Sequence, residues 1–378
     1  MDNDFNPFLT ENYISKDYFC DREKEVEFIK KKLENGNNLT IISNRRLGKT
    51  ALIYRIFEEF ELQNGIGIFV DIFSCTNLKS FTEALALAIF KRFPEKKGIG
   101  KRFMELLKGF RPIISYDHLT GQPEIRFDYQ TQTVYEHTIE GLFQFIDKQD
   151  TKIYIAIDEF QQIATFPEKN IEAILRTIIQ SLKNINFIFS GSKKQMMSEM
   201  FNSASRPFFA SAQIIGLDEI SFEKYREFII KKFAERKRVI DENAVDFILE
   251  WTLRHTYYTQ VICNSVFSEN KKHINLELVK LICDEQLTMQ QTTFMQYRDL
   301  LSPVQWKMLI AVAKEGLIFE PQAKEFLLKH NIGAASSAKK ALTALLNKEM
   351  VCSIETPEKT AYRVYNVFLM RWLERVFR

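Results

Sequence analysis

The sequence predicts an α/β fold in which helices cover both faces of a parallel sheet, with a helical region and a winged helix after it. Up to residue 217, short apolar runs rich in β-branched residues alternate with longer amphipathic stretches. This alternation is typical of a parallel sheet that is buried on both faces. After residue 217 the strand pattern stops, and residues 222–287 show the spacing of amphipathic helices.

Five apolar segments are the predicted strands of the sheet, and turn residues such as Asn64-Gly65 separate them from the helices. We expect the strands at 39–42, 66–73, 153–157, 187–189 and 213–215. We expect the helices between and before them at 21–33, 51–63, 81–93, 134–149 and 170–182.

The spacing of apolar residues in the first two helices predicts which side of each faces the core. Asp21 is the expected N-cap of the helix at 21–33, because its side chain can accept hydrogen bonds from free N–H groups. The predicted buried residues of this helix are Val26, Phe28, Ile29 and Leu33. Those of the helix at 51–63 are Leu52, Ile53, Ile56, Phe57 and Phe60.

Residues 94–127 interrupt this alternation of strands and helices. Charged and glycine residues at 94–101 predict a surface loop. The segments 113–116 and 125–127 predict a hairpin around a turn at 118–123. Two interpretations of this hairpin stay open, namely an exposed site for a partner and an insertion that packs against the core.

Residues 302–378 predict three helices, two short strands and a closing helix, which is the element order of a winged helix. The strands are expected at 350–354 and 361–365, on either side of a wing at 355–359. The spacing of apolar residues also predicts which residues of two of these helices face the core. The helix that begins at Ser302-Pro303 buries Trp306, Leu309 and Ile310, and the helix at 334–348 buries Ala341, Leu342, Leu345 and Leu346.

Composition narrows the class of protein. A length of 378 residues, with 46% hydrophobic and 27% charged residues, predicts a globular chain of two or three domains. The 52 basic and 49 acidic residues nearly balance, which neither requires nor excludes a nucleic-acid partner. Five dispersed cysteines without a CxxC pair predict reduced thiols and no zinc site. Short apolar runs and a polar N-terminus predict a cytoplasmic protein without a membrane partner.

The segment 43–51 carries the strongest functional signal. Gly48-Lys49-Thr50 opens the helix after the first strand, as in a phosphate-binding P-loop, but Ser43 stands where the pattern has its first glycine. In such a loop, backbone N–H groups and the helix N-terminus surround a phosphate. We expect Lys49 to bridge the β- and γ-phosphates and the Thr50 hydroxyl to bind Mg²⁺. Ser43 carries a conformational cost if its position requires a positive φ angle.

Two carboxylates follow the third predicted strand. Asp158 and Glu159 come directly after the apolar run 153–157, at the edge of a parallel sheet where ligands bind. We expect Asp158 to hold Mg²⁺ through water, and Glu159 to orient or deprotonate an attacking water. A solvated acidic pair at a strand end is the alternative.

Three further residues have two interpretations each. Ser190 and Ser192 end the next strand, where they contact either the γ-phosphate or the attacking water, or else only form a turn. Of the two, Ser192 is the predicted catalytic residue. Arg206 is a candidate arginine finger, and the alternative is an arginine that pins a surface loop.

Together these residues resemble the archaeal-type ATPase family, a signal-transduction group of P-loop ATPases related to AAA+ proteins. The resemblance spans roughly residues 6–265 and rests on the following segments. They are Asn6-Pro7-Phe8 with the Arg22-Glu23-Lys24-Glu25 stretch, Arg45 to Thr50, Ile157 to Gln161, and Phe189 to Ser192. Two departures are Ser43 and the stretch Arg254-His255-Thr256-Tyr257-Tyr258, where the family usually has Gly-His-Pro-Tyr-Tyr. Arg254 is either a sensor arginine or a surface charge.

The resemblance implies a P-loop core with a five-stranded sheet, a helical lid and a winged-helix tail, and ATP with Mg²⁺ as ligands. The domain bounds that we predict are 1–217, 218–290 and 291–378. The predicted nucleotide-binding residues are Arg22, Ser43, Asn44, Arg45, Arg46, Leu47, Gly48, Lys49, Thr50 and Ala51. The predicted catalytic residues are Lys49, Glu159 and Ser192, and the predicted metal ligands are Thr50 and Asp158.

Three functions follow from these expectations. The first is a nucleotide-driven switch that engages a protein partner, and the second is an ATPase that binds DNA through its winged helix. For the second, Ser336, Ser337, Lys339 and Lys340 would face the DNA. Residues 302–378 hold twelve Lys or Arg against seven Asp or Glu, which is only mildly basic. The third is a nucleotide-binding module with little turnover, and the sequence leaves the oligomeric state open.

Overall fold

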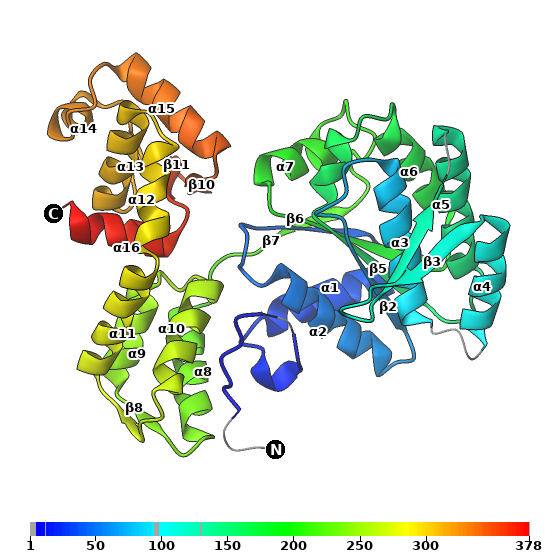
Figure 1. The fold of residues 1–378 in the computed structure, drawn as a ribbon, viewed down its shortest axis with the longest axis horizontal. Coiled ribbons are helices and arrows are strands. Elements are labelled where there is room, and N and C mark those ends of the chain that lie inside the picture. The colour runs from blue at the N-terminus through cyan, green and yellow to red at the C-terminus, as the bar shows by residue number, and fades with distance from the viewer. Residues whose placement is uncertain (1–4, 12, 94–97, 129–130, 378) are drawn as a thin grey trace. The chain divides into compact units, whose positions relative to one another are not determined.

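The computed structural model describes residues 5–11, 13–93, 98–128 and 131–377 (Figure 1). They form two compact units. One unit is Glu11–Glu219, and the other joins the segment up to Thr10 with Ile220–Arg378. The domain bounds at 217 and 290 expected from the sequence stay a prediction.

The first unit is built on a parallel sheet of five strands in the order β2-β5-β6-β1-β7. The strands are β1 (Leu39–Ile42), β2 (Ile66–Asp71), β5 (Ile153–Asp158), β6 (Ile185–Gly191) and β7 (Gln213–Gly216). Every residue of β5 and β6 is buried, which explains why both segments are nearly uninterrupted apolar runs in the sequence. The predicted α/β fold with a parallel sheet is confirmed.

Helices cover both faces of this sheet (Figure 1). One face holds α1 (Glu23–Glu34) and α2 (Lys49–Glu61), which share one hydrophobic cluster with the sheet. The other face holds α3 (Leu78–Arg92), α5 (Gln132–Asp147) and α6 (Ile171–Ser181), which share a second, larger cluster. All five residues predicted to face inward on α2 are buried.

Two expectations for the start of α1 are wrong. Its N-cap is Arg22, which has a left-handed backbone with φ of 75°, and not Asp21. Phe28 is 45% exposed, whereas Val26, Ile29 and Leu33 are buried as predicted. The reason is geometric, because Phe28 follows Val26 by two residues and therefore lies on the opposite side of a helix with about 3.6 residues per turn.

The insertion between α3 and α5 contains more regular structure than the sequence predicted. α4 (Ile99–Gly109) overlaps the segment 94–101 that was expected to be a loop, of which 94–97 lie outside the described residues. β3 (Pro112–Tyr116) and β4 (Pro123–Phe127) form the predicted hairpin. Phe127 is buried in the cluster under α3, and its N–H donates to Glu83 Oε1 at 3.0 Å. β4 therefore packs against the core, whereas Ile113 and Tyr116 of β3 are more than half exposed, so the interpretation as a partner site stays open.

Four short elements of this unit were not predicted. They are the 3₁₀ helices η1 (Lys16–Tyr18) and η2 (Phe160–Thr165), the helix α7 (Lys194–Asn202), and the short extension of β6 to Gly191. α7 buries Met197, Met200 and Phe201 against the sheet. The helix is only nine residues long, so the segment lacks the long periodic pattern that identifies a helix from sequence.

The second unit begins with a helical bundle. Its helices are α8 (Phe222–Ala234), α9 (Glu242–Trp251), α10 (Thr256–Ser268) and α11 (Leu276–Met289). A short parallel pair, β8 (Val239–Ile240) with β9 (His273–Ile274), corrects the expectation that strands stop after residue 217. The N-terminal segment packs against this helical bundle. The centre of the Phe8 ring lies 5.1 Å from the centre of the Phe233 ring, and Asn6 Nδ2 donates to the Asn264 carbonyl oxygen at 2.9 Å.

The winged helix follows α12 (Gln291–Asp299) and confirms the predicted element order. It consists of α13 (Pro303–Glu315), α14 (Lys324–Lys329), α15 (Ala335–Asn347), β10 (Val351–Glu355), β11 (Thr360–Val364) and α16 (Val367–Val376). Ser302 and Gln305 form a capping box at the start of α13. Ile310 and Leu346 are half-buried, whereas the other predicted core residues of α13 and α15 are buried.

Two chain-wide expectations can be compared with the structure. All five cysteines are free, and four of them are buried. Within the part of the chain that the structure describes, none of the helices combines the length and the apolar character that a membrane span requires.

Candidate functional site

The loop between β1 and α2 has the backbone that a phosphate-binding turn requires. Gly48 is the N-cap of α2 and has φ of 95°, a conformation that residues with a side chain rarely adopt. Arg46 also lies in the left-handed region, with φ of 62°. Ser43 does not have a positive φ, so replacing the usual first glycine by serine carries no backbone strain here.

Lys49 is folded into this loop. Its ammonium donates to the carbonyl oxygens of Ser43 and Asn44, both at 3.2 Å, and to Ser43 Oγ at 3.4 Å. The residue is only 6% exposed. Burial lowers the pKa of Lys49, and the nearby charges of Asp158 and Glu159 oppose this effect. A poorly hydrated cation is thus held at the centre of the loop, where an anion would meet it.

Asp158 joins the ends of β5 and β6 to the start of α2. Thr50 Oγ1 donates to Asp158 Oδ2 at 3.1 Å, and Ser190 Oγ donates to the other carboxylate oxygen. The backbone N–H of Glu159 also donates to Asp158 Oδ1, at 3.0 Å. Burial raises the pKa of Asp158, although the hydrogen bond from Ser190 opposes this shift. The hydroxyl and the carboxylate predicted as metal ligands therefore lie in contact.

Glu159 lies beside Asp158 with its carboxylate held by two side chains. Ser192 Oγ donates to Glu159 Oε2 at 2.7 Å, and Gln161 Nε2 donates to the same oxygen. Arg45 Nε of the loop donates to Ser192 Oγ at 3.3 Å. Glu159 itself has φ of 56°, in the left-handed region, so the chain turns sharply after β5. The loop and the glutamate are connected through Ser192.

Residues that are distant in the sequence therefore converge at one edge of the sheet. The loop before α2 supplies a cation and a hydroxyl, the end of β5 supplies two carboxylates, and the end of β6 supplies two serines. A cation at a helix N-terminus suits phosphate oxygens, and adjacent oxygen ligands suit Mg²⁺. This edge has the groups that are needed to hold a nucleoside triphosphate and a water molecule beside it.

Comparison with known families identifies the family of the chain. Residues 19–254, more than half of the chain, match the profile of a family described as "ATPase domain predominantly from Archaea". The chain belongs to this archaeal-type ATPase family. Residues 292–375 match a second family, described as "Probable winged helix domain". No curated protein matches this chain.

Solved structures support the fold of this ATPase. The Walker-type ATPase of Pyrococcus abyssi is 16% identical, with a TM-score of 0.66 over 97% of this chain and 99% of that one. The ORC2 protein of Aeropyrum pernix, solved with ADPNP and ADP, is 14% identical, with a TM-score of 0.60 over 98% and 97%. The ORC1 protein of Aeropyrum pernix, solved with DNA, is 12% identical, with a TM-score of 0.53 over 95% and 93%. At these identities the likeness concerns the fold.

Other predicted residues of this ATPase lie in different surroundings. Arg22 is buried, pairs with Glu25 at 2.8 Å, and donates to the Asp218 carbonyl. These partners lie on α1 and in the segment after β7. In the loop, Leu47 is buried and Ala51 is half-buried in the first turn of α2.

Arg206 and Arg254 are the two candidate arginines that lie outside the loop in the sequence. Arg206 pairs with Glu172, and its guanidinium lies 3.5 Å from Glu199. This arrangement fits the alternative in which Arg206 pins a surface loop. Arg254 belongs to the second unit and has φ of 56°, and its role as a sensor stays a prediction.

One contact of the site was not predicted. Gln161 is buried, and its side-chain amide donates to the carboxylate of Glu159, a contact that the sequence pattern did not predict. The sequence feature that could have indicated this contact is the position of Gln161, two residues after Glu159 and just beyond an apolar strand. Because the chain turns into η2 at this point, the side chain of Gln161 returns to the carboxylate.

Proposed function

We propose that this chain binds ATP together with Mg²⁺ and hydrolyses it, and that the bound nucleotide sets a conformation that engages a macromolecular partner. The observation that supports this most directly is the contact between Thr50 and Asp158 at 3.1 Å, beside Lys49 and Glu159. We place the protein in the cytoplasm, where free cysteines such as these stay reduced.

In the proposed complex, the loop 43–51 surrounds the phosphates with its backbone N–H groups. Lys49 exchanges the carbonyl oxygens of Ser43 and Asn44 for oxygens of the β- and γ-phosphates. Because Lys49 is already buried, this exchange costs little further desolvation. Arg22, which the family resemblance places near the adenine, completes the proposed nucleotide-binding set.

The side chains present fit Mg²⁺ held on a nucleotide. Thr50 and Asp158 offer a hydroxyl and a carboxylate, which are the hard oxygen ligands that Mg²⁺ prefers. No group of three or more His, Cys, Asp or Glu side chains able to hold a metal occurs in the described residues. The ion would therefore be bound by two protein groups and by phosphate oxygens. When bound, Mg²⁺ would neutralise charge on the phosphates.

Glu159 and Ser192 are the proposed catalytic pair. Glu159 accepts a proton from the attacking water as the water oxygen bonds to the γ-phosphorus. The bond from the γ-phosphorus to the bridging oxygen breaks, and ADP leaves with the electron pair. Ser192, which now donates to Glu159 at 2.7 Å, orients the carboxylate and the water. Lys49 stabilises the charge that develops on the phosphates.

The proposed switch follows from the chain of contacts that starts at the loop. Arg45 contacts Ser192, and Ser192 contacts Glu159. A γ-phosphate in the loop would attract Arg45 and release Ser192 toward the water. Nucleotide state would thus change the end of β6 and the segment after it, which is the conformational signal that we assign to a protein partner.

The first test is single-turnover hydrolysis of ATP with binding measured in parallel. We expect the native chain to bind and hydrolyse Mg-ATP. Lys49→Ala should lose binding, and Glu159→Gln should bind with native affinity but turn over at least about 100-fold more slowly. Lys183→Ala, an exposed lysine that precedes β6 at the end of the strand away from the site, is a matched control that should change neither quantity.

Each outcome of this test has a clear meaning. If the native chain binds no nucleotide after stripping and refilling with Mg-ATP, the proposed function is wrong. If it binds but no condition gives turnover, the chain is the nucleotide-binding module with little turnover. If Glu159→Gln hydrolyses at the native rate, another residue prepares the water.

A second candidate function is DNA binding through the winged helix. Ser336, Ser337, Lys339 and Lys340 are exposed on one face of α15, and Ala338, Ala341 and Leu342 are buried on the other. The third helix of a winged helix can enter the major groove in this orientation. We expect affinity for duplex DNA that falls steeply with salt, because binding of lysines to phosphates releases counterions. An affinity that does not change with salt would contradict this candidate.

A further inference from the structure

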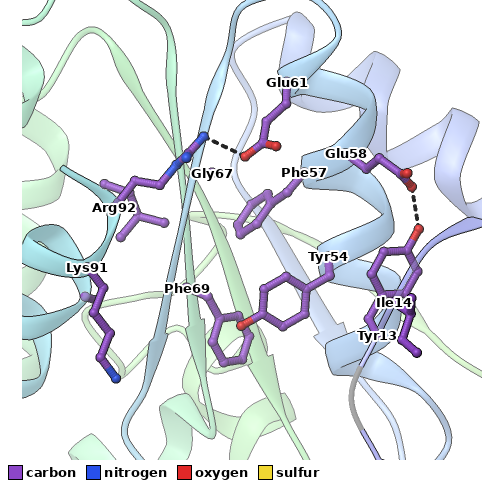
Figure 2. Close-up of a pocket in the computed structure, with 12 residues that line it drawn as sticks. Tyr13, Ile14, Tyr54, Phe57, Glu58, Glu61, Gly67, Phe69, Lys91 and Arg92 are labelled. Carbon is purple, nitrogen blue, oxygen red and sulfur yellow. Dashed lines mark hydrogen bonds and ion pairs between the residues drawn. The ribbon is translucent and has the colours of Figure 1, made fainter. Parts of the chain in front are cut away.

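A groove runs along the free edge of the sheet, at strand β2 (Figure 2). It encloses about 420 Å³ and lies entirely within the first unit. α2 forms one wall together with Tyr13 and Ile14, and the end of α3 forms the other. The lining residues are Tyr13, Ile14, Tyr54, Phe57, Glu58, Glu61, Gly67, Ile68, Phe69, Ala88, Lys91 and Arg92.

The backbone of β2 offers hydrogen-bonding groups to this groove. β2 is at the end of the strand order and pairs with β5 on its other side. The N–H of Ile66 donates to Lys152 and that of Ile72 donates to Asp158, so even-numbered residues direct their N–H groups toward β5. Because the direction alternates along a strand, Gly67 and Phe69 direct theirs outward, into the groove.

The wall on the α2 side is aromatic. The Phe69 ring stacks on Tyr54 at 5.0 Å, and Tyr54 lies parallel to Tyr13 at 6.5 Å. The Phe57 ring packs directly on Gly67, since a Cβ at position 67 would lie 2.3 Å from that ring. Tyr54 is 39% exposed although it is a large apolar side chain. The groove thus presents an uncovered aromatic surface beside unpaired strand amides.

The wall on the α3 side is basic. Lys91 and Arg92 are exposed near the end of α3, and Ala88, one turn earlier, contributes only a methyl group to this wall. Arg92 forms an ion pair with Glu61 across the groove at 2.6 Å, as Figure 2 shows. The two side chains are 38% and 48% exposed, so the pair contributes little stability. A carboxylate from a ligand can therefore take the place of Glu61.

We propose that this groove binds an extended, acidic segment of a partner protein, which adds to the sheet as a strand beside β2. Alternate residues of such a strand face opposite walls. Its apolar residues would face Tyr54 and Phe69, and its Asp or Glu residues would face Lys91 and Arg92. The backbone amides of Gly67 and Phe69 would donate to its carbonyl oxygens.

A second copy of this chain fits the groove poorly. If two copies joined their β2 edges antiparallel about a twofold axis, each α3 would lie beside the α3 of the other copy. The lining residues that α3 contributes, Ala88, Lys91 and Arg92, include no acidic side chain, so the α3 wall of a second copy brings no opposite charge to Lys91 and Arg92. An acidic segment has the complementary charge.

This inference names the partner class of the proposed switch, but it does not depend on hydrolysis. The experiment therefore uses the full chain without nucleotide. The probe is a fluorescein-labelled peptide of about seven alternating Val and Glu residues, the length of an ordinary strand. Fluorescence anisotropy should show saturable binding, and the same peptide with Lys in place of Glu should not bind.

Two charge reversals locate the binding. Lys91→Glu combined with Arg92→Glu should weaken binding of the Val-Glu peptide at least about tenfold, because two favourable ion pairs become repulsive. Lys79→Glu is the matched control, since Lys79 is exposed at the other end of α3 and outside the groove. It should bind within about twofold of the native chain. Equal loss in both variants would overturn the proposal.

Amide exchange distinguishes strand addition from attraction between surface charges. The peptide should slow hydrogen exchange at Gly67 and Phe69, whereas Ile68, which already faces β5, should change little. Binding without slower exchange at Gly67 and Phe69 would overturn the proposal, and so would a chain that is dimeric with these amides protected before peptide is added. Single-turnover hydrolysis of ATP is measured separately, so a failure of the peptide test leaves the proposed function standing.

Discussion

The edge of the sheet where β5 and β6 end and the outer face of α15 use similar side chains in opposite surroundings. At the sheet edge, Lys49, Asp158 and Ser190 come from three separate segments, are buried, and are hydrogen-bonded to one another or to the loop. On α15, the serines and lysines at 336–340 lie within one helical turn and a half and are exposed. One region is assembled by the fold, and the other is contained in a single helix.

This difference teaches how each region responds to change. Buried polar groups depend on one another, because each has given up its contacts with water and is stabilised by its protein partners. Exposed lysines remain hydrated and act on a polyanion one charge at a time. We therefore expect large and specific losses at the sheet edge, and small and additive losses on α15.

The largest effect should come from Asp158→Ala. Removal of a metal-binding carboxylate should lower the affinity for Mg-ATP by about 100-fold or more, because Thr50 alone cannot hold the ion. Isothermal titration calorimetry measures the affinity with Mg²⁺ and again with the metal chelated. Lys340→Ala is the contrast on α15 and should leave both affinities unchanged. A loss for Asp158→Ala that is equally large without Mg²⁺ would refute the metal role.

The next effect concerns pH. Burial raises the pKa of Asp158, so its carboxylate takes up a proton at a higher pH than an exposed aspartate does. Because Mg²⁺ requires the ionised form, affinity for Mg-ATP should fall by up to about tenfold for each pH unit below that pKa. Titration calorimetry across pH should show this fall in the native chain. Asp158→Asn should bind weakly at every pH, and a pH profile equal to the native one would contradict the assignment.

The same raised pKa has a consequence for stability, with the opposite sign. The folded chain binds a proton at Asp158 in the range between the ordinary aspartate pKa and the raised one, where the unfolded chain does not. The stability of the nucleotide-free protein should therefore fall as pH rises through this range, and the loss persists above it. Asp158→Asn removes this loss, so its thermal midpoint at neutral pH should equal or exceed that of the native chain.

The fold was largely predictable because strong local patterns agreed with it. β5 and β6 are buried along their whole length, and α2 has its apolar residues at helical spacing. The segments that were missed are short. α7 has nine residues, α4 has eleven and begins within a charged stretch that contains glycine, and β8 and β9 have two residues each. Only the tertiary fold brings such short strands together.

The candidate site was predictable where its residues are part of a motif, and not where it depends on a turn. Lys49, Thr50 and Asp158 were expected together because parallel strands end at one edge. The contact of Gln161 with Glu159 was not, since it follows from the left-handed turn at Glu159. The unstrained backbone at Ser43 was equally hidden, because a sequence does not show which loop residue takes the positive φ angle.

A smaller effect should follow Ser192→Ala. This change removes one hydrogen bond to Glu159 and one contact with Arg45, and leaves the loop and Asp158 in place. Loss of about 1 kcal/mol of orientation corresponds to a roughly fivefold lower kcat, with KM unchanged. Ser198→Ala, an exposed serine on α7, is the control. A higher KM at native kcat would mean that Ser192 binds substrate and does not position Glu159.

The smallest effects should be those of Lys339→Ala and Lys340→Ala on DNA binding. Each lysine that contacts a phosphate should account for about 0.9 of the slope of log affinity against log salt. Each variant should therefore lower affinity only a few-fold at moderate salt, with the two losses adding and ATP binding unchanged. Anisotropy titrations with a labelled duplex at several salt concentrations measure these slopes. Because α15 presents both lysines from one exposed turn, a loss much larger than additive would show that its face is a cooperative site like the sheet edge. The contrast between the two regions would then fail.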